Sequence, residues 1–179
     1  MKYVLDTQAW LWSVLDHPRL SRRARAALGA VPRQERVGIA AISLKEAAWH
    51  LAHGRVVVDE GFGPWPLWLR TAASSPDLEV LPLTVDVAID SEQLGDSFPQ
   101  DPADRLIAAT ARVHDLTLIT ADRPIRRSAA VRGISALARM LCRPLSTCGE
   151  RKLIVDLTRT LPEESRISTG RPRRTKAAR

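Results

Sequence analysis

The sequence "DPADRLIAATARVHDLTLITADRPI" (101–125) gives the clearest indication of the fold, because it predicts a helix, then a strand, then a turn that carries an acid. Asp101 followed by Pro102 is typical of a helix N-cap with proline in the first turn. The apolar run that follows predicts a helix over about 102–114. "LTLIT" (116–120) has high β propensity and predicts a strand that ends at the turn "ADRP".

Asp101 and Asp104, at the front of this helix, have two interpretations. Asp104 would be the third helical residue, where a carboxylate faces free N–H groups and the positive end of the helix dipole. Capping alone therefore explains both acids locally. Whether Asp104 also binds a metal depends on the acids elsewhere in the chain.

The same alternation of strand and helix runs through the rest of the chain. Further strands are predicted at 2–5, 36–42, 78–83 and, weakly, 129–134. Further helices are predicted at 7–17, 21–30, 43–54, 62–74 and 84–95. Thr7 and Ser43 are candidate caps of two of these helices. Alternating strands and helices predict a three-layer α/β/α sandwich around a central parallel sheet.

Four acids fall where such a sheet gathers its loops. Asp6 ends the first strand and Asp122 follows the 116–120 strand, while Glu46 and Asp104 lie in the first turns of helices. Ligands bind beyond the carboxyl ends of parallel strands, so the four can converge. Each also has a structural interpretation: Asp6 and Asp122 as turn acids, Glu46 as the capping-box partner of Ser43, and Asp104 as part of its cap.

Crowded carboxylates repel one another and take up protons unless a cation compensates them. Mg²⁺ or Mn²⁺, which prefer oxygen ligands, would fill that role. Such ions clamp phosphoryl oxygens, activate water and support in-line attack on a phosphodiester. The four acids therefore point to metal-dependent hydrolysis without a nucleophile from the protein.

At these residues the chain resembles the PIN-domain ribonucleases, and among them the VapC-type toxins of bacterial toxin–antitoxin pairs. The resemblance covers residues 1–134 and rests on "YVLDTQAWLW" (3–12), "ISLKEAAWHLAHGRV" (42–56), "DPADRLIAATA" (101–111) and "LTLITADRPI" (116–125). It implies a divalent metal, cleavage of RNA, an antitoxin partner and a homodimer.

The resemblance also assigns roles to individual residues. Asp6, Glu46, Asp104 and Asp122 become the catalytic, metal-binding set. Thr120 matches a hydroxyl that the family places near the metal, Ser43 matches the cap before the glutamate, and Asp101 has a cap or supporting role. Gln8 stands where members of this type often have His.

Several basic and aromatic side chains are candidates for other roles. Arg55 and Arg105 are candidates to meet substrate phosphates, although they could instead neutralise the acids. His50 and His53 are expected to face solvent. Trp65 and Trp68 form a candidate patch for dimerisation or antitoxin docking.

Two other function classes compete with a nuclease. A haloacid-dehalogenase-like phosphatase needs a second Asp two residues after the strand-end Asp6, where this chain has Gln8. A PIN-like or response-regulator-like binding module without catalysis should have lost at least one acid, and none is missing. "GxSxG", "GxGxxG" and the P-loop pattern are absent, so the sequence gives no support for a serine hydrolase or a nucleotide-binding fold.

The net charge of +7 is unevenly distributed. Residues 1–122 carry a net charge of −4 and residues 123–179 carry +11. We expect residues 1–134 to form the nuclease domain and residues 135–179 to be a basic extension, weakly structured or disordered. This extension is either an RNA-binding arm or the product of an altered reading frame.

The remaining features concern location. Cys142 and Cys148 are too few for a disulfide framework or a four-ligand zinc site. The chain shows no apolar run long enough to span a membrane and no signal peptide, so a cytoplasmic location is expected.

Overall fold

The computed structural model describes residues 1–137, and its centre is a five-stranded sheet in which every neighbouring pair is parallel. The strand order is β3-β2-β1-β4-β5. The strands are β1 (Tyr3–Leu5), β2 (Val37–Ala40), β3 (Leu78–Leu81), β4 (Thr117–Thr120) and β5 (Gly133–Ser135). Because successive strands lie first on one side of β1 and then on the other, the order reverses between β1 and β4.

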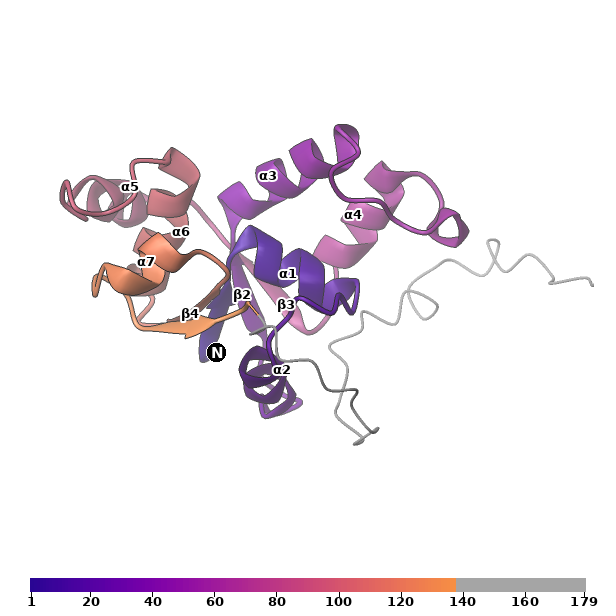
Figure 1. Ribbon diagram of the computed structural model, residues 1–179, viewed down its shortest axis with the longest axis horizontal. Helices are drawn as coiled ribbons and strands as arrows, with labels where there is room; N and C mark the ends of the chain where they lie inside the picture. Colours follow the sequence, from indigo (N-terminus) through magenta and orange to yellow (C-terminus); the bar gives the residue numbers. More distant parts are fainter. Residues whose placement is uncertain (138–179) are drawn as a thin grey trace, which may run out of the picture.

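Helices cover both faces of this sheet, which confirms the predicted α/β/α sandwich (Figure 1). The helices are α1 (Thr7–Val14), α2 (Arg22–Gly29), α3 (Ala41–Ala52), α4 (Trp65–Ala73), α5 (Val85–Glu92), α6 (Pro102–Val113) and α7 (Arg123–Arg127). A 3-10 turn, Glu60–Phe62, precedes α4. In Figure 1, α5, α6 and α7 gather on one side, and α1, α3 and α4 on the other.

Two apolar cores follow from the alternation of side chains along the strands. Tyr3 and Leu5 of β1 join the core shared with α1 to α4, whereas Val4 joins the core shared with α6 and α7. All three β1 side chains are buried. A central strand covered on both faces must be apolar throughout, so its first exposed polar position can come only after it ends.

The predicted elements are present, but several of their ends differ. The edge strand β5 occupies Gly133–Ser135, later than the predicted 129–134, and Ala136 after it is fully buried. The "ADRP" turn is the start of the short helix α7. The predicted boundary at residue 134 is therefore too early, because the folded unit runs at least to Leu137, which pairs with Leu20. Most of the predicted basic extension, residues 138–179, lies outside the described residues.

The predicted tryptophan patch is half wrong. Trp68 is 1% exposed and belongs to the core, whereas Trp65 is 37% exposed. The two residues are three apart on α4, but the helix buries Trp68 and leaves Trp65 exposed. Among residues 1–137, no helix has the length and apolar character that a membrane span requires.

Candidate active site

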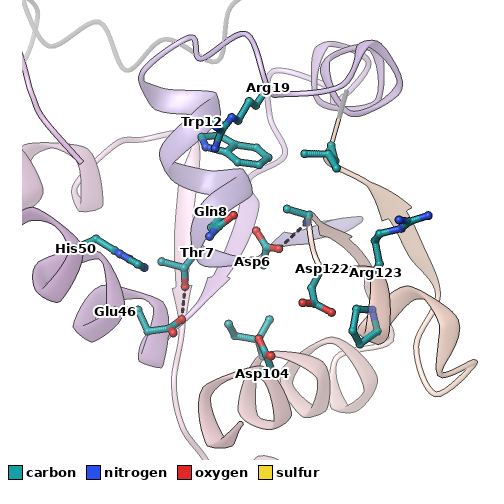
Figure 2. Close-up of a pocket in the computed structure, with 14 residues that line it drawn as sticks. Asp6, Thr7, Gln8, Trp12, Arg19, Glu46, His50, Asp104, Asp122 and Arg123 are labelled. Atoms are coloured by element: carbon teal, nitrogen blue, oxygen red, sulfur yellow. Dashed lines mark hydrogen bonds between the residues drawn. The ribbon is translucent and has the colours of Figure 1, made fainter. Parts of the chain in front are cut away.

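A cavity of about 460 Å³ opens where β1 and β4 end, at the point where the strand order reverses (Figure 2). This is the crevice in which open parallel sheets bind ligands. Asp6, Glu46, Asp104 and Asp122 all line it. The four predicted acids therefore share one cavity, although they come from positions up to 116 residues apart in the sequence.

Asp6 is the most firmly held of the four. One carboxylate oxygen accepts from the backbone N–H of Ala9 at 2.5 Å and the other from that of Ala121 at 2.8 Å. The first bond makes Asp6, and not the predicted Thr7, the N-cap of α1. Burial raises the pKa of Asp6, while hydrogen bonds from Thr120, Ala9 and Ala121 act in the opposite direction. The side chain thus joins the ends of β1 and β4 and stays fixed in orientation.

Glu46 points into the cavity because α3 starts earlier than predicted. The helix begins at Ala41 with Ala40 as its N-cap, so Ser43 is not a cap and Glu46 is not part of a capping box. Its carboxylate accepts a hydrogen bond of 2.6 Å from the hydroxyl of Thr7 (Figure 2). The interpretation of Glu46 as a capping-box partner of Ser43 is therefore wrong, and Glu46 instead contacts Thr7 on the neighbouring helix α1.

Ser43 itself is fully buried in the first turns of α3. Its hydroxyl has no hydrogen-bond partner among the described residues. The structure gives no role to this hydroxyl, and its predicted place in the site stays a prediction.

The two acids at the start of α6, Asp101 and Asp104, have different roles in the structure. Asp101 caps the helix, accepting from the N–H groups of Ala103 and Asp104 at 2.9 and 3.2 Å. Asp104 lines the cavity. Burial, followed by the charges of Asp122, Asp101, Glu46 and Asp6, raises the pKa of Asp104 to about 7. Asp101 is therefore a cap, and Asp104 is electrostatically coupled to the other acids.

Asp122 and Thr120 complete the site from the end of β4. Asp122 caps α7 by accepting from the N–H of Ile125 at 2.9 Å. The backbone N–H of Asp122 donates to the hydroxyl oxygen of Thr120 at 2.9 Å. The Thr120 hydroxyl also forms a hydrogen bond with the carboxylate of Asp6, which lowers the pKa of Asp6. Thr120 is fully buried and links two of the acids.

The donor set fits a divalent cation in its chemistry. None of the four acids forms an ion pair with a basic side chain of residues 1–137. No three of the described acids, histidines or cysteines converge closely enough to form a complete ligand set for one ion as they stand. Mg²⁺ is usually held by only one or two carboxylates and keeps several waters, so an open ring of carboxylates satisfies its requirements.

The two predicted phosphate contacts are placed elsewhere. Arg105 is buried and donates to the carbonyls of Ser91, Glu92 and Gly95, where α5 ends. Arg55 lies over the ring of Trp49 at 4.3 Å. Neither residue lines the cavity, so neither is positioned to meet a phosphate there or to neutralise the acids.

Other side chains line the cavity without having been predicted. They include Arg19, Arg123, Trp12 and the half-buried His50. Trp12 follows the lining residue Gln8 by four positions, a spacing that places both on one helix face and could have revealed it. Arg19 reaches the cavity through the loop after α1, for which the sequence carries no comparable signal.

Comparison with known proteins agrees with this fold and site. The model of the PIN domain family matches residues 3–131. The chain therefore belongs to the PIN domain family.

One curated relative extends the comparison. The chain is 36% identical over 123 residues to a protein named Ribonuclease VapC22 from Mycobacterium tuberculosis (strain ATCC 25618 / H37Rv), covering 69% of this chain and 88% of that protein. The family and this relative agree with the resemblance that the sequence suggested.

Solved structures share the fold. FitAcB from Neisseria gonorrhoeae has a TM-score of 0.56 at 26% identity, covering 75% of this chain and 97% of the other. VapBC2 from Rickettsia felis bound to a DNA fragment of its promoter has a TM-score of 0.57 at 16% identity, covering 75% and 98%. A toxin–antitoxin complex from Klebsiella pneumoniae has a TM-score of 0.55 at 22% identity, covering 77% and 100%.

Proposed function

We propose that this protein is a Mg²⁺- or Mn²⁺-dependent endoribonuclease that acts as the toxin of a toxin–antitoxin pair. The observation that carries the proposal is the set of four coupled acids around one cavity at the strand-order reversal. Membership of the PIN domain family and the 36% identity to Ribonuclease VapC22 support the substrate class.

In this proposal Asp6, Glu46, Asp104 and Asp122 hold the metal. A bound divalent ion would supply charge stabilisation at a phosphodiester and a water of lowered pKa. Hydrogen bonds orient two of the acids in advance: Asp6 through Ala9 and Ala121, and Glu46 through Thr7. Such preorganisation means that these carboxylates need little rearrangement when a cation and a substrate arrive.

The protonation of Asp104 should respond to the binding of the metal. With its pKa at about 7, it holds a proton for part of the time near neutral pH. A cation among the acids would favour its ionised form. Binding of the metal should therefore release protons near neutral pH, and the affinity for the metal should rise with pH.

The proposed partner is a cognate antitoxin protein. The relative named as a VapC ribonuclease and the resemblance of four sequence stretches to VapC-type toxins support this part of the proposal. A small neighbouring reading frame that encodes a DNA-binding protein would be the matching genetic observation. Co-purification of that protein with this chain, with loss of RNA cleavage in the complex, would test the partnership.

We further propose that residues 1–137 form the complete nuclease domain. The support is that β5 closes the sheet and that Ala136 and Leu137 still contact the body of the fold. A chain truncated after Leu137 should keep the parent's melting temperature and cleavage rate. A loss of either would assign a role to the residues beyond it.

RNA cleavage by the purified chain tests the function as a whole. Single-stranded RNA should be cut in the presence of Mg²⁺ or Mn²⁺ and left intact in excess EDTA. Asp6→Asn should abolish cutting in the same preparation. Undiminished cleavage by Asp6→Asn, or cleavage that persists in EDTA, would contradict the metal-dependent assignment.

A further inference from the structure

The rim of the active-site cavity differs in character from the ring of acids. Trp12 and Arg19 lie together on one side of the cavity, away from Glu46 and Asp104 (Figure 2). Trp12 comes from the last turns of α1, and Arg19 from the loop that follows. An aromatic ring and a cation next to an acidic centre are more than a metal site requires.

Trp12 is partly exposed and held in a defined orientation. Its ring stacks on that of His17, with the centroids 5.8 Å apart and the planes 19° from parallel. The Nδ1 of His17 in turn accepts from the backbone N–H of Arg19 at 3.2 Å. The loop between Trp12 and Arg19 is thereby organised around His17, so the two side chains are presented as a unit.

The guanidinium of Arg19 has no structural task within residues 1–137. It forms no hydrogen bond and no ion pair there, although the cavity that it lines is also lined by four carboxylates. Arginines with structural tasks look different: Arg25 binds Asp16, and Arg105 binds three carbonyls. A cation left free beside an acidic cavity is available to an anionic ligand.

We propose that Trp12 and Arg19 form a nucleotide subsite, in which a base of single-stranded RNA stacks on Trp12 and a neighbouring phosphate contacts Arg19. The inference rests on the proposed ribonuclease function, because it concerns the substrate of the same cavity. Unstacked bases of single-stranded RNA are commonly held on aromatic rings, and cations beside the rings follow the backbone. The cavity of about 460 Å³ lies within the usual range for small-ligand sites.

Equilibrium binding of RNA tests the subsite without relying on cleavage. All variants are made in the full chain carrying Asp104→Asn, and a fluorescent ten-nucleotide single-stranded RNA is titrated by anisotropy. Trp12→Leu should raise Kd about 5- to 100-fold, and Trp12→Phe should restore most of the affinity because it keeps an aromatic face. An oligonucleotide of the same length made of abasic nucleotides should bind the parent and Trp12→Leu equally.

Arg19→Gln should act through charge. It should raise Kd at low salt and reduce the slope of log Kd against log salt by about 0.7, the value for one lost phosphate contact to a single strand. Trp65→Leu and Arg33→Gln are the matched controls, because both residues are exposed and neither lines the cavity. These controls should leave Kd within about twofold of the parent. Melting temperatures show which variants are folded at the temperature of the titration.

The outcomes separate the subsite from the function. If the parent binds no RNA, the proposed function fails and this inference fails with it. If the parent binds RNA but Trp12→Leu and Trp12→Phe both bind as tightly as the controls, the subsite is wrong and the function stands. An equal loss of affinity for the abasic strand would also overturn the stacking role, because that strand has no base to stack.

Discussion

Replacing Asp104 by Asn should stabilise the metal-free protein at alkaline pH. The folded protein holds the Asp104 pKa at about 7, against an ordinary value of 3.8. That difference corresponds to about 4 kcal/mol, at about 1.4 kcal/mol for each factor of ten in the proton equilibrium. Because the side chain is only half-buried, solvent screening reduces the expected gain to about 2 kcal/mol.

The sign of the effect follows from proton linkage. Between pH 3.8 and about 7 the unfolded chain has lost the Asp104 proton while the folded chain keeps it, so the parent loses stability as the pH rises. The Asn side chain has no proton to lose. The advantage of Asp104→Asn should therefore be near zero below about pH 4 and reach its full size above about pH 7.

Urea unfolding in EDTA at pH 5 and pH 8 measures this difference. The variant should exceed the parent by about 2 kcal/mol at pH 8 and by less than about 1 kcal/mol at pH 5. Asp77→Asn is the control, since Asp77 is exposed and outside the cavity. A variant no more stable than the parent at pH 8, or equally stabilised at both pH values, would refute the crowding of acids on which the site depends.

Three further substitutions test other contacts. Asp101→Ala should cost about 1 kcal/mol of unfolding free energy, because it removes the N-cap of α6. Asp101→Asn should cost little, because Asn is also a good N-cap residue. Equal losses for the two variants in chemical denaturation would show that the cap does not stabilise the protein. Arg105→Ala should cost about 3 kcal/mol of unfolding free energy, since it leaves three carbonyls without their buried donor. Arg112→Ala, which removes the more exposed ion pair with Asp90, should cost less than about 1 kcal/mol. Comparable losses in the two variants would contradict the structural role of Arg105. Thr7→Val should lower kcat for RNA cleavage about tenfold at an unchanged melting temperature, because it frees Glu46, and an unchanged kcat would show that this hydrogen bond does not orient the carboxylate.

The fold could be predicted because it depends on patterns that are local in sequence. Alternating apolar runs and cap signals placed all five strands and six of the seven helices, and the alternation itself implied a parallel sheet. Positions at strand ends and in the first turns of helices were enough to predict that all four acids meet, and they line one cavity. The parallel sheet explains why acids that are distant in the sequence lie close together in the structure.

The errors arise where one local signal has two physical outcomes. Ser43 and Glu46 have the spacing of a capping box, but "RVGIAAI" turns into helix two residues before Ser43, so the cap is lost and Glu46 faces the site. An arginine beside an acid is equally compatible with a phosphate contact and with a structural anchor, and Arg105 is the anchor. Arg19 depends on how a loop folds back around His17, which no spacing in the sequence encodes.

The metal requirement itself has a direct thermodynamic signature. Calorimetric titration of the parent with Mg²⁺ or Mn²⁺ near pH 7 should release protons, seen as heats that depend on the ionisation enthalpy of the buffer. The proton release should diminish in Asp104→Asn, whose side chain cannot ionise.

RNA cleavage by two neighbouring variants separates a metal-binding role of Asp104 from a role in capping α6. Asp104→Asn and Asp101→Asn each replace one carboxyl group at the start of α6 by an amide, yet only Asp104 lines the cavity. In one RNA cleavage assay with Mn²⁺, Asp104→Asn should lose at least about a hundredfold in rate, as expected when a metal-binding carboxylate is removed, while Asp101→Asn stays within about threefold of the parent. Equal activity in the two variants, or a greater loss in Asp101→Asn, would contradict the assignment of Asp104 to a metal-dependent active site.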